Sequence, residues 1–366
     1  MNQYELDTPC ILVDYTKLLN NIYRYQQIAD DAGVALRPHV KTHKTPQIAH
    51  LQVEAGAVGI TVAKLGEAEV MADAGIRNIV IAYPIVGEAK LERLIRLAKR
   101  VELTVACDSY EVAAGISAAA LNAGIVINVW IEIDPGYGRV GVQPGENLLR
   151  LAESLAPLQG IRVTGVLEFA GHSYDAESDE QRKEVAVREA VTAATAADTL
   201  RGCGFPVETV SGGSTPVSRF ASLMEGVTEI RPGTYVFGDL TQVKAGALDL
   251  GQCALTVLAT VISRPAPDRA VIDGGTKVFT MDGEDSVIGT GRGFVVGHPD
   301  ITVSWFNEEH GVLTLPPSEQ GLKVGDKLEI IPVHCCAVVN MLDELNIVQD
   351  GQVKDTWTIA ARGKVK

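Results

Sequence analysis

An alternation of short and long segments between residues 11 and 215 limits the possible folds of this chain more than any other feature. Short runs rich in β-branched residues, bounded by Gly, Pro, Asp or Asn, alternate with longer amphipathic stretches of helical periodicity. Strands that alternate with helices form a parallel sheet. Eight repeats in about 200 residues favour a closed (β/α)8 barrel over an open sheet. We predict its strands at residues 11–14, 35–41, 59–63, 78–84, 102–108, 126–134, 162–170 and 208–212.

The pattern changes after about Gly246. The following segments are short, rich in β-branched residues and separated by turns, with no convincing long helix. We therefore predict an α/β chain in two domains, a barrel at residues 11–245 and a mostly β domain at residues 246–366. Residues 1–10 precede the barrel, and the alternative that they join the β domain stays open.

Charge and composition narrow the classes of partner. The chain has 46 acidic and 32 basic residues, a formal net charge of -14, which opposes binding to nucleic acid or to an anionic membrane. The sequence shows no signal peptide and no apolar run approaching the roughly 18 residues that span a bilayer. Six cysteines are too few for a disulfide scaffold. We expect a cytoplasmic protein without nucleic-acid or membrane partners.

Polar residues follow several predicted strands, where barrels keep their catalytic groups. Lys41 lies at the end of the second strand, in RPHVKTHK. A lysine at an apolar barrel mouth loses its proton readily and can attack an aldehyde to form a Schiff base. On an extended chain His39, Lys41 and His43 would share one side and Lys44 the other, which favours Lys41. The alternative is a basic loop without chemistry.

The SGGSTP segment at residues 211–216 follows the eighth strand, where barrels often bind phosphate. Gly213 lets the main chain approach an anion, and Ser214 and Thr215 add hydroxyl donors. An ordinary turn explains the segment equally well. Three residues of the next segment could close such a cradle: Gly233, Thr234 and Tyr235.

Arg139 lies in a Gly-rich turn after the sixth strand. Its planar guanidinium could donate hydrogen bonds to an oxygen of a cofactor. A salt bridge with Asp134 is the competing explanation.

His334 and Cys336 stand two residues apart in IIPVHCCAVV, which has the pattern of a strand, so both would point to one face and Cys335 to the other. Imidazole and thiolate favour zinc or another borderline-soft divalent ion. Two ligands leave coordination positions open, as a catalytic metal requires. The alternative is a buried histidine with two core cysteines.

These segments together resemble the D-threonine aldolase and D-serine dehydratase family, pyridoxal-phosphate enzymes related to alanine racemase. The resemblance covers essentially the whole chain and runs in the family's order. It rests on DTPCILVD, RPHVKTHKT, the D-x-G-x-x-R-x-G of residues 134–141, SGGSTP, RPGTYVFGD, APDRAVIDGG, EEHG at residues 308–311 and PVHCC.

The resemblance implies a role for each candidate. Lys41 would carry pyridoxal 5'-phosphate, and Arg139 would lie near the phenolic oxygen of the cofactor. His334 and Cys336 would hold the divalent metal, zinc in preference to manganese. The implied fold is an alanine-racemase-like barrel followed by a β domain, in a homodimer. The region around the phosphate would contain Ser214, Thr215, Gly233 and Tyr235.

The sequence does not assign one reaction within this family. Cys336 and the GHSY of residues 171–174 are typical of D-serine dehydratases, whereas the carboxyl-terminal stretch resembles bacterial D-threonine aldolases. We favour a lyase of the D-serine dehydratase type, which acts on D-3-hydroxy-amino acids and releases a 2-oxo acid and ammonia. The alternative is an aldolase that releases glycine and an aldehyde, with His172 or Tyr174 as the base. An amino-acid racemase is a weaker rival, since it needs no metal pair. Leu167 leaves the pyridine nitrogen without a polar partner in this interpretation.

Overall fold

The computed structural model describes residues 1–282 and 288–366 of the chain, which forms two compact units. The β unit consists of Met1–Ile22, Thr42–Gln47 and Thr234–Arg362. The barrel unit consists of Tyr23–Lys41, Ile48–Gly233 and Gly363–Lys366. The units are therefore interleaved in sequence, and the chain crosses between them after residues 22, 41, 47, 233 and 362.

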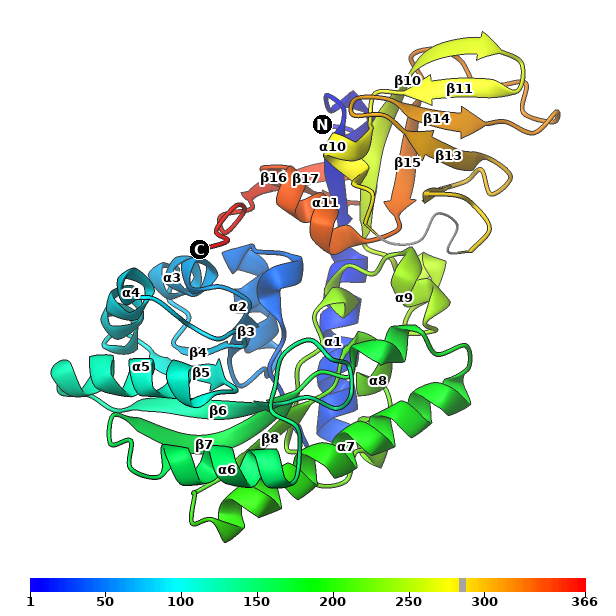
Figure 1. Cartoon of the computed structure of the whole chain (residues 1–366). Coiled ribbons are helices and arrows are strands. Elements are labelled where there is room, and N and C mark those ends of the chain that lie inside the picture. The colour runs from blue at the N-terminus through cyan, green and yellow to red at the C-terminus, as the bar shows by residue number, and fades with distance from the viewer. Residues whose placement is uncertain (283–287) are drawn as a thin grey trace. The chain divides into compact units, whose positions relative to one another are not determined.

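The barrel unit contains an eight-stranded parallel sheet in the order β2-β9-β8-β7-β6-β5-β4-β3 (Figure 1). A parallel bridge between His39, just after β2, and Thr61 in β3 joins the two edges of this sheet. The predicted barrel is thus confirmed. Its strands are β2 (Ala35–Leu36), β3 (Ile60–Val62), β4 (Asn78–Ile81), β5 (Glu102–Cys107), β6 (Ile127–Ile133), β7 (Ile161–Glu168), β8 (Thr209–Gly212) and β9 (Glu229–Ile230).

Helices cover the outside of these strands, as Figure 1 shows for α3 to α7. Burial on both faces explains why the strands are almost continuously apolar, as in β3, where all three residues are buried. The helices are α1 (Tyr15–Ala32), which begins in the β unit, α2 (Pro46–Glu54), α3 (Leu65–Asp73), α4 (Glu88–Ala98), α5 (Tyr110–Asn122), α6 (Glu146–Leu155), α7 (Asp179–Gly202) and α8 (Thr215–Ser218).

The β unit contains a nine-stranded sheet in the order β11-β14-β13-β12-β15-β10-β1-β16-β17, and β10 also pairs with β11. This confirms the predicted β-rich second domain. Its strands are β1 (Cys10–Asp14), β10 (Leu255–Ala266), β11 (Arg269–Ile272), β12 (Gly293–Val295), β13 (Thr302–Phe306), β14 (Gly311–Thr314), β15 (Lys327–Pro332), β16 (Glu344–Gln349) and β17 (Gln352–Thr358). Its helices are α9 (Leu240–Lys244), α10 (Thr276–Phe279) and α11 (Cys335–Met341).

The prediction that residues 11–14 form a barrel strand is wrong. They belong to β1, which pairs antiparallel with β10 and parallel with β16. The eighth barrel strand is the two-residue β9 instead. A short apolar run satisfies either sheet, and partners more than 200 residues away in sequence decide between them.

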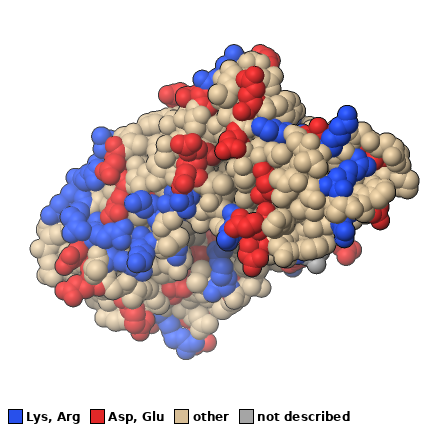
Figure 2. All heavy atoms as spheres, turned by 90° about the horizontal axis from the view of Figure 1, so that it is seen from above, with Lys and Arg blue, Asp and Glu red and all other residues tan. Residues whose placement is uncertain are grey.

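The outer surface carries charges of both signs. Figure 2 shows Lys and Arg side chains among Asp and Glu on the face that it draws. Several basic residues are ion-paired, as Arg93 is with Glu69 at 2.6 Å and Arg100 with Asp73 at 2.5 Å. Among the described residues, none of the helices has the length and apolar character needed to cross a membrane.

Candidate functional site

Lys41 follows β2 in a 3-10 turn, η2 (Val40–Thr42). The predicted extended alternation of residues 39, 41 and 43 is therefore wrong. The imidazole Nδ1 of His39 accepts the backbone N–H of Lys41 at 3.4 Å, a local bond that favours the turn. The Lys41 Nζ lies 5.8 Å from the ring centre of Phe169, just beyond the end of β7.

Arg139 packs against the same aromatic ring. Its Cζ lies 4.8 Å from the Phe169 ring centre. Both candidates therefore lie around one side chain at the carboxyl ends of the strands, as the barrel prediction required. The acidic partner of Arg139 is the buried Glu132, at 3.6 Å, and the competing salt bridge with Asp134 is not formed. Asp134 instead accepts the backbone N–H groups of Gly136 and Gly138, which shapes the turn.

The strand-8 loop runs from Gly213 into the short helix α8, whose N-cap residue is Ser214. Gly213 has φ +81°, and a Cβ there would lie 2.8 Å from the Ser218 Oγ. Glycine is thus required for this approach of main chain and hydroxyl. The Ser218 Oγ is buried and has no hydrogen-bond partner among the described residues. An unsatisfied hydroxyl beside a close main-chain approach suits an anion such as phosphate.

The backbone around Thr215 is fixed from behind. The hydroxyl of Tyr25 donates to the Thr215 carbonyl at 3.1 Å, and Tyr25 is fully buried. The Gly213 N–H donates to Glu189 on α7 at 2.8 Å, so this N–H is already used within the protein. The predicted contribution of Gly213 to a phosphate site is therefore conformational.

The other predicted phosphate residues lie where the chain enters the β unit. Gly233 ends the barrel unit, and η5 (Thr234–Val236) begins the next segment of the β unit. Tyr235 is fully buried. The Thr234 Oγ1 lies 3.9 Å from the Cys336 Sγ, so this hydroxyl neighbours the predicted metal pair.

His172 and Tyr174 lie in the turn η3 (Gly171–Tyr174) after β7. Desolvation, and then the charge of Arg188, lower the pKa of His172, which favours a neutral imidazole able to accept a proton. Ser173 in the same turn hydrogen-bonds to Ser214 at 3.1 Å, which links this turn to the strand-8 loop.

His334 and Cys336 lie at the junction of β15 and α11, not on one strand face as predicted. β15 ends at Pro332, His334 is the N-cap residue of α11, and Cys336 lies in the first turn. The i, i+2 strand argument is therefore wrong, although both side chains belong to one small polar cluster. The buried Cys335 lies between them. A hydrogen bond from Cys335 and the charge of His334 outweigh desolvation and hold the pKa of Cys336 well below its usual value.

Asp239, at the N-cap of α9, is the residue that organises this cluster. Its Oδ2 lies 3.2 Å from the His334 Nδ1 and accepts the Cys335 N–H at 3.0 Å. Bonding of Nδ1 to a carboxylate favours the imidazole tautomer whose Nε2 can bind a metal. This Nε2 lies 3.9 Å from the Oδ2 of Asp282. The Cys336 Sγ lies 3.3 Å from the Thr42 Oγ1. Within the described residues, no group of three or more His, Cys, Asp or Glu side chains gathers around one point, so a closed structural zinc site is not formed there.

Sequence reasoning missed Arg231, which begins the RPGTYVFGD segment after β9. Its side chain is buried, and its Nη2 donates to the Glu168 carbonyl at 2.6 Å. Its Nη1 has no hydrogen-bond partner among the residues that the structure describes. The RPGTYVFGD motif, which begins with Arg231, is the sequence signal that points to this residue. This donor is a candidate for the polar partner that Leu167 cannot provide.

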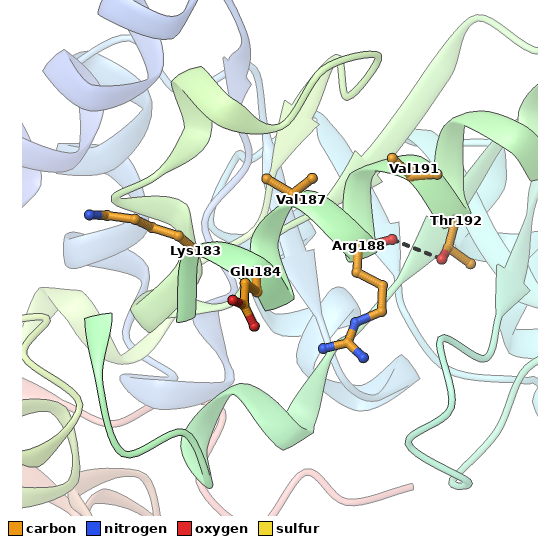
Figure 3. Close-up of a pocket in the computed structure, with 6 residues that line it drawn as sticks. All are labelled: Lys183, Glu184, Val187, Arg188, Val191 and Thr192. Atoms are coloured by element: carbon orange, nitrogen blue, oxygen red, sulfur yellow. Dashed lines mark hydrogen bonds between the residues drawn. The ribbon is translucent and has the colours of Figure 1, made fainter. Parts of the chain in front are cut away.

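A shallow hollow of about 440 Å³ lies along the outer face of α7 and contains none of these candidates. Figure 3 shows its side chains along this single helix: Lys183, Glu184, Val187, Arg188, Val191 and Thr192.

Comparison with known proteins shows what kind of enzyme this geometry belongs to. Residues 13–241 match the model for the alanine racemase N-terminal domain. The chain belongs to this family. Residues 254–348 match the model of a putative serine dehydratase domain, which accounts for most of the β unit.

Individual relatives of this alanine-racemase-like chain are lyases. It is 36% identical to the D-threonine aldolase of Arthrobacter sp over 98% of this chain and 93% of that protein. It is also 36% identical to the D-threo-3-hydroxyaspartate dehydratase of Delftia sp. (strain HT23), over 96% of this chain and 97% of that protein. The structure of a cysteine-to-alanine mutant of D-threo-3-hydroxyaspartate dehydratase, in the metal-free form, matches with a TM-score of 0.91 and 35% identity, covering 98% of each chain. The predicted family is thus confirmed, and the chain is a pyridoxal-phosphate-dependent lyase.

The residues of this lyase fit both groups that its family implies. In the barrel unit, the amine of Lys41, the unsatisfied Ser218 hydroxyl and the unsatisfied Arg231 Nη1 suit the aldehyde, phosphate and ring of the cofactor. In the β unit, a thiolate and an imidazole whose Nδ1 is held by Asp239 suit a borderline-soft divalent ion. The open coordination positions suit a metal that takes part in catalysis.

Proposed function

We propose that this lyase removes water from D-3-hydroxy-amino acids and releases a 2-oxo acid and ammonia, with D-serine as the simplest substrate. The observation that carries the proposal is the His334/Cys336 pair with Asp239 behind it. A metal held by two protein ligands has positions open for a substrate hydroxyl. The predicted zinc remains our choice, because a thiolate ligand favours it over manganese.

In the sequence, Lys41 stands next to a residue that contacts the metal pair. Lys41 is bonded to Thr42, whose hydroxyl lies 3.3 Å from the Cys336 Sγ. Consecutive Cα atoms are about 3.8 Å apart, so the peptide bond keeps the Lys41 backbone close to Thr42, the residue that contacts Cys336.

Each residue would then have a distinct task. The Lys41 Nζ would take the Cα proton of the substrate, and pyridoxal phosphate, when bound, supplies an electron sink for the pair left on that carbon. The Arg139 guanidinium would hold the phenolic edge of the cofactor, while Ser214, Thr215 and Tyr235 would bind around its phosphate.

His334 and Cys336 would hold the metal, a Lewis acid, against the β-hydroxyl of the substrate. The Cα–H and Cβ–O bonds break, the proton goes to Lys41 and the hydroxyl leaves as hydroxide. The resulting enamine takes up a proton at Cβ and becomes an imine, and addition of water to this imine releases ammonia and the 2-oxo acid.

The second candidate is retro-aldol cleavage to glycine and an aldehyde. Desolvation keeps the imidazole of His172 neutral, and a neutral base is what removal of the hydroxyl proton requires. Tyr174, two residues further along the same turn, is the other predicted base.

Product analysis tests the proposal directly. Metal-loaded protein is incubated with D-serine, D-threonine and D-3-hydroxyaspartate, and 2-oxo acid, ammonia, glycine and aldehyde are all measured. We expect 2-oxo acid and ammonia in equal amounts, lost after chelation and in Lys41→Ala. Accumulation of glycine with an aldehyde would establish the second candidate instead. Turnover that survives complete metal removal would refute the role of the pair.

A further inference from the structure

The carboxylate of Glu189 lies buried behind the strand-8 loop of the barrel. Glu189 belongs to α7 and is 1% exposed. Its Oε1 accepts the Gly213 N–H at 2.8 Å, and its Oε2 has no hydrogen-bond partner among the described residues. Gly213 begins the strand-8 loop, so this side chain holds the start of that loop.

A charge at this position is costly. Desolvation raises the pKa of Glu189 to about 7, although the Gly213 N–H and the Arg231 charge lower it. The other charged groups nearby are Glu168 from β7 and Arg231 after β9. A glutamine could accept the Gly213 N–H without this cost, so stability of the fold does not explain an acid here.

The loop that Glu189 holds is the candidate phosphate cradle. The Gly213 N–H points toward α7, and Gly213 has a positive φ. In this conformation a Cβ on Gly213 would lie 2.8 Å from the unsatisfied Ser218 hydroxyl. An ionised acceptor binds a backbone N–H group more strongly than a neutral one does.

We propose that Glu189 is a positioning residue that fixes the strand-8 loop, through Gly213, in the conformation that binds the cofactor phosphate. The inference rests on the cofactor site of the proposed function. Glu189 does not touch the cofactor, and its effect should appear in cofactor affinity before it appears in stability.

The test is a titration of the apoprotein with pyridoxal phosphate at pH 8, followed through the absorption band that depends on Lys41. We expect Glu189→Gln to weaken binding by roughly tenfold, the effect of losing one charge-assisted hydrogen bond. The unfolding temperature of the apoprotein should stay equal or rise, because a buried charge has been removed. The control Glu184→Gln lies on the exposed face of the same helix (Figure 3) and should match the wild type.

A second readout is the pH dependence of the affinity. Between pH 8 and pH 6 the wild type should lose more affinity than Glu189→Gln, because only the wild type loses the carboxylate charge. Wild-type affinity in Glu189→Gln would overturn the inference, as would parallel losses of affinity and unfolding temperature. Absence of any Lys41-dependent band in the wild type would instead overturn the cofactor site itself.

Discussion

Replacement of Asp239 by asparagine tests the metal site at a residue that is not a ligand. The Oδ1 of Asp239 accepts the Gln242 N–H at 2.9 Å, while Oδ2 faces the His334 Nδ1 and the Cys335 N–H. If the asparagine oxygen keeps the hydrogen bond to Gln242, its NH2 group faces the His334 Nδ1–H and the Cys335 N–H, which are also donors. His334 then relieves the conflict by moving its proton to Nε2, which removes the lone pair needed for the metal.

The magnitude follows from the same contacts. Loss of an orienting partner of a metal-bound histidine typically weakens metal binding by about 10- to 100-fold, or about 1.4 to 2.7 kcal/mol. Competition with a chromophoric zinc chelator at pH 7.5 measures this shift. Asp300→Asn, an exposed acid-to-amide change in the same unit, is the matched control.

Two outcomes would refute this reasoning. The first is wild-type zinc affinity in folded Asp239→Asn protein, and the second is an equal loss of zinc affinity in Asp300→Asn. The N-cap hydrogen bond to Gln242 contributes about 1 kcal/mol to the stability of the fold. Thermal unfolding therefore checks that Asp239→Asn is still folded. His334→Ala gives the scale for complete loss of a ligand.

Four further predictions concern other residues. Lys41→Ala should remove the near-visible absorption band that borohydride quenches in the wild type; a band that persists would assign the cofactor to another lysine. Cys336→Asp should shift metal preference from zinc toward manganese in metal competition, and an unchanged preference would mean that Cys336 is not a ligand. Gly213→Ala should lower the free energy of unfolding in urea by about 1 to 2 kcal/mol and weaken cofactor binding, because φ at this residue is +81° and the new Cβ would clash with the Ser218 hydroxyl. Wild-type stability and affinity would contradict this loop geometry. Desolvation and then the charge of Glu189 raise the pKa of Glu168 to about 10, so the folded state favours the protonated form of Glu168. The stability that this provides is complete below the ordinary carboxyl pKa and is lost as the pH rises toward 10. Glu168→Gln should therefore make the unfolding midpoint depend less on pH between pH 7 and pH 10.

The architecture of the barrel could be predicted because it depends on local signals. Helical periodicity, strand runs and turn residues repeat often enough to identify seven of the eight barrel strands, and the candidates Lys41 and Arg139 both follow strands as expected. Pairing partners are not local, which is why β1 was assigned to the wrong sheet. The HCC segment has strand character in sequence, but Asp239, nearly 100 residues earlier, binds the Cys335 N–H at the start of α11.

The supporting residues were harder to foresee for a related reason. Asp239, Glu189 and Arg231 act through backbone groups or through other side chains, and no spacing rule connects them to those partners. Each is an ordinary charged residue in the sequence. Their importance comes from burial, which makes an ionised group costly unless hydrogen-bond partners or opposite charges surround it.

The position of β1 has a consequence for the order of events during synthesis. Ile11 pairs with Val257 on one side and with Leu345 on the other, so this early strand gains its second neighbour only after nearly the whole polypeptide has been made. Contacts between residues so distant in sequence slow folding, because a long loop must close before they form. On the ribosome, the backbone groups of the apolar β1 would stay unpaired until its partner strands are synthesised. During this time the nascent chain could bind chaperones or aggregate.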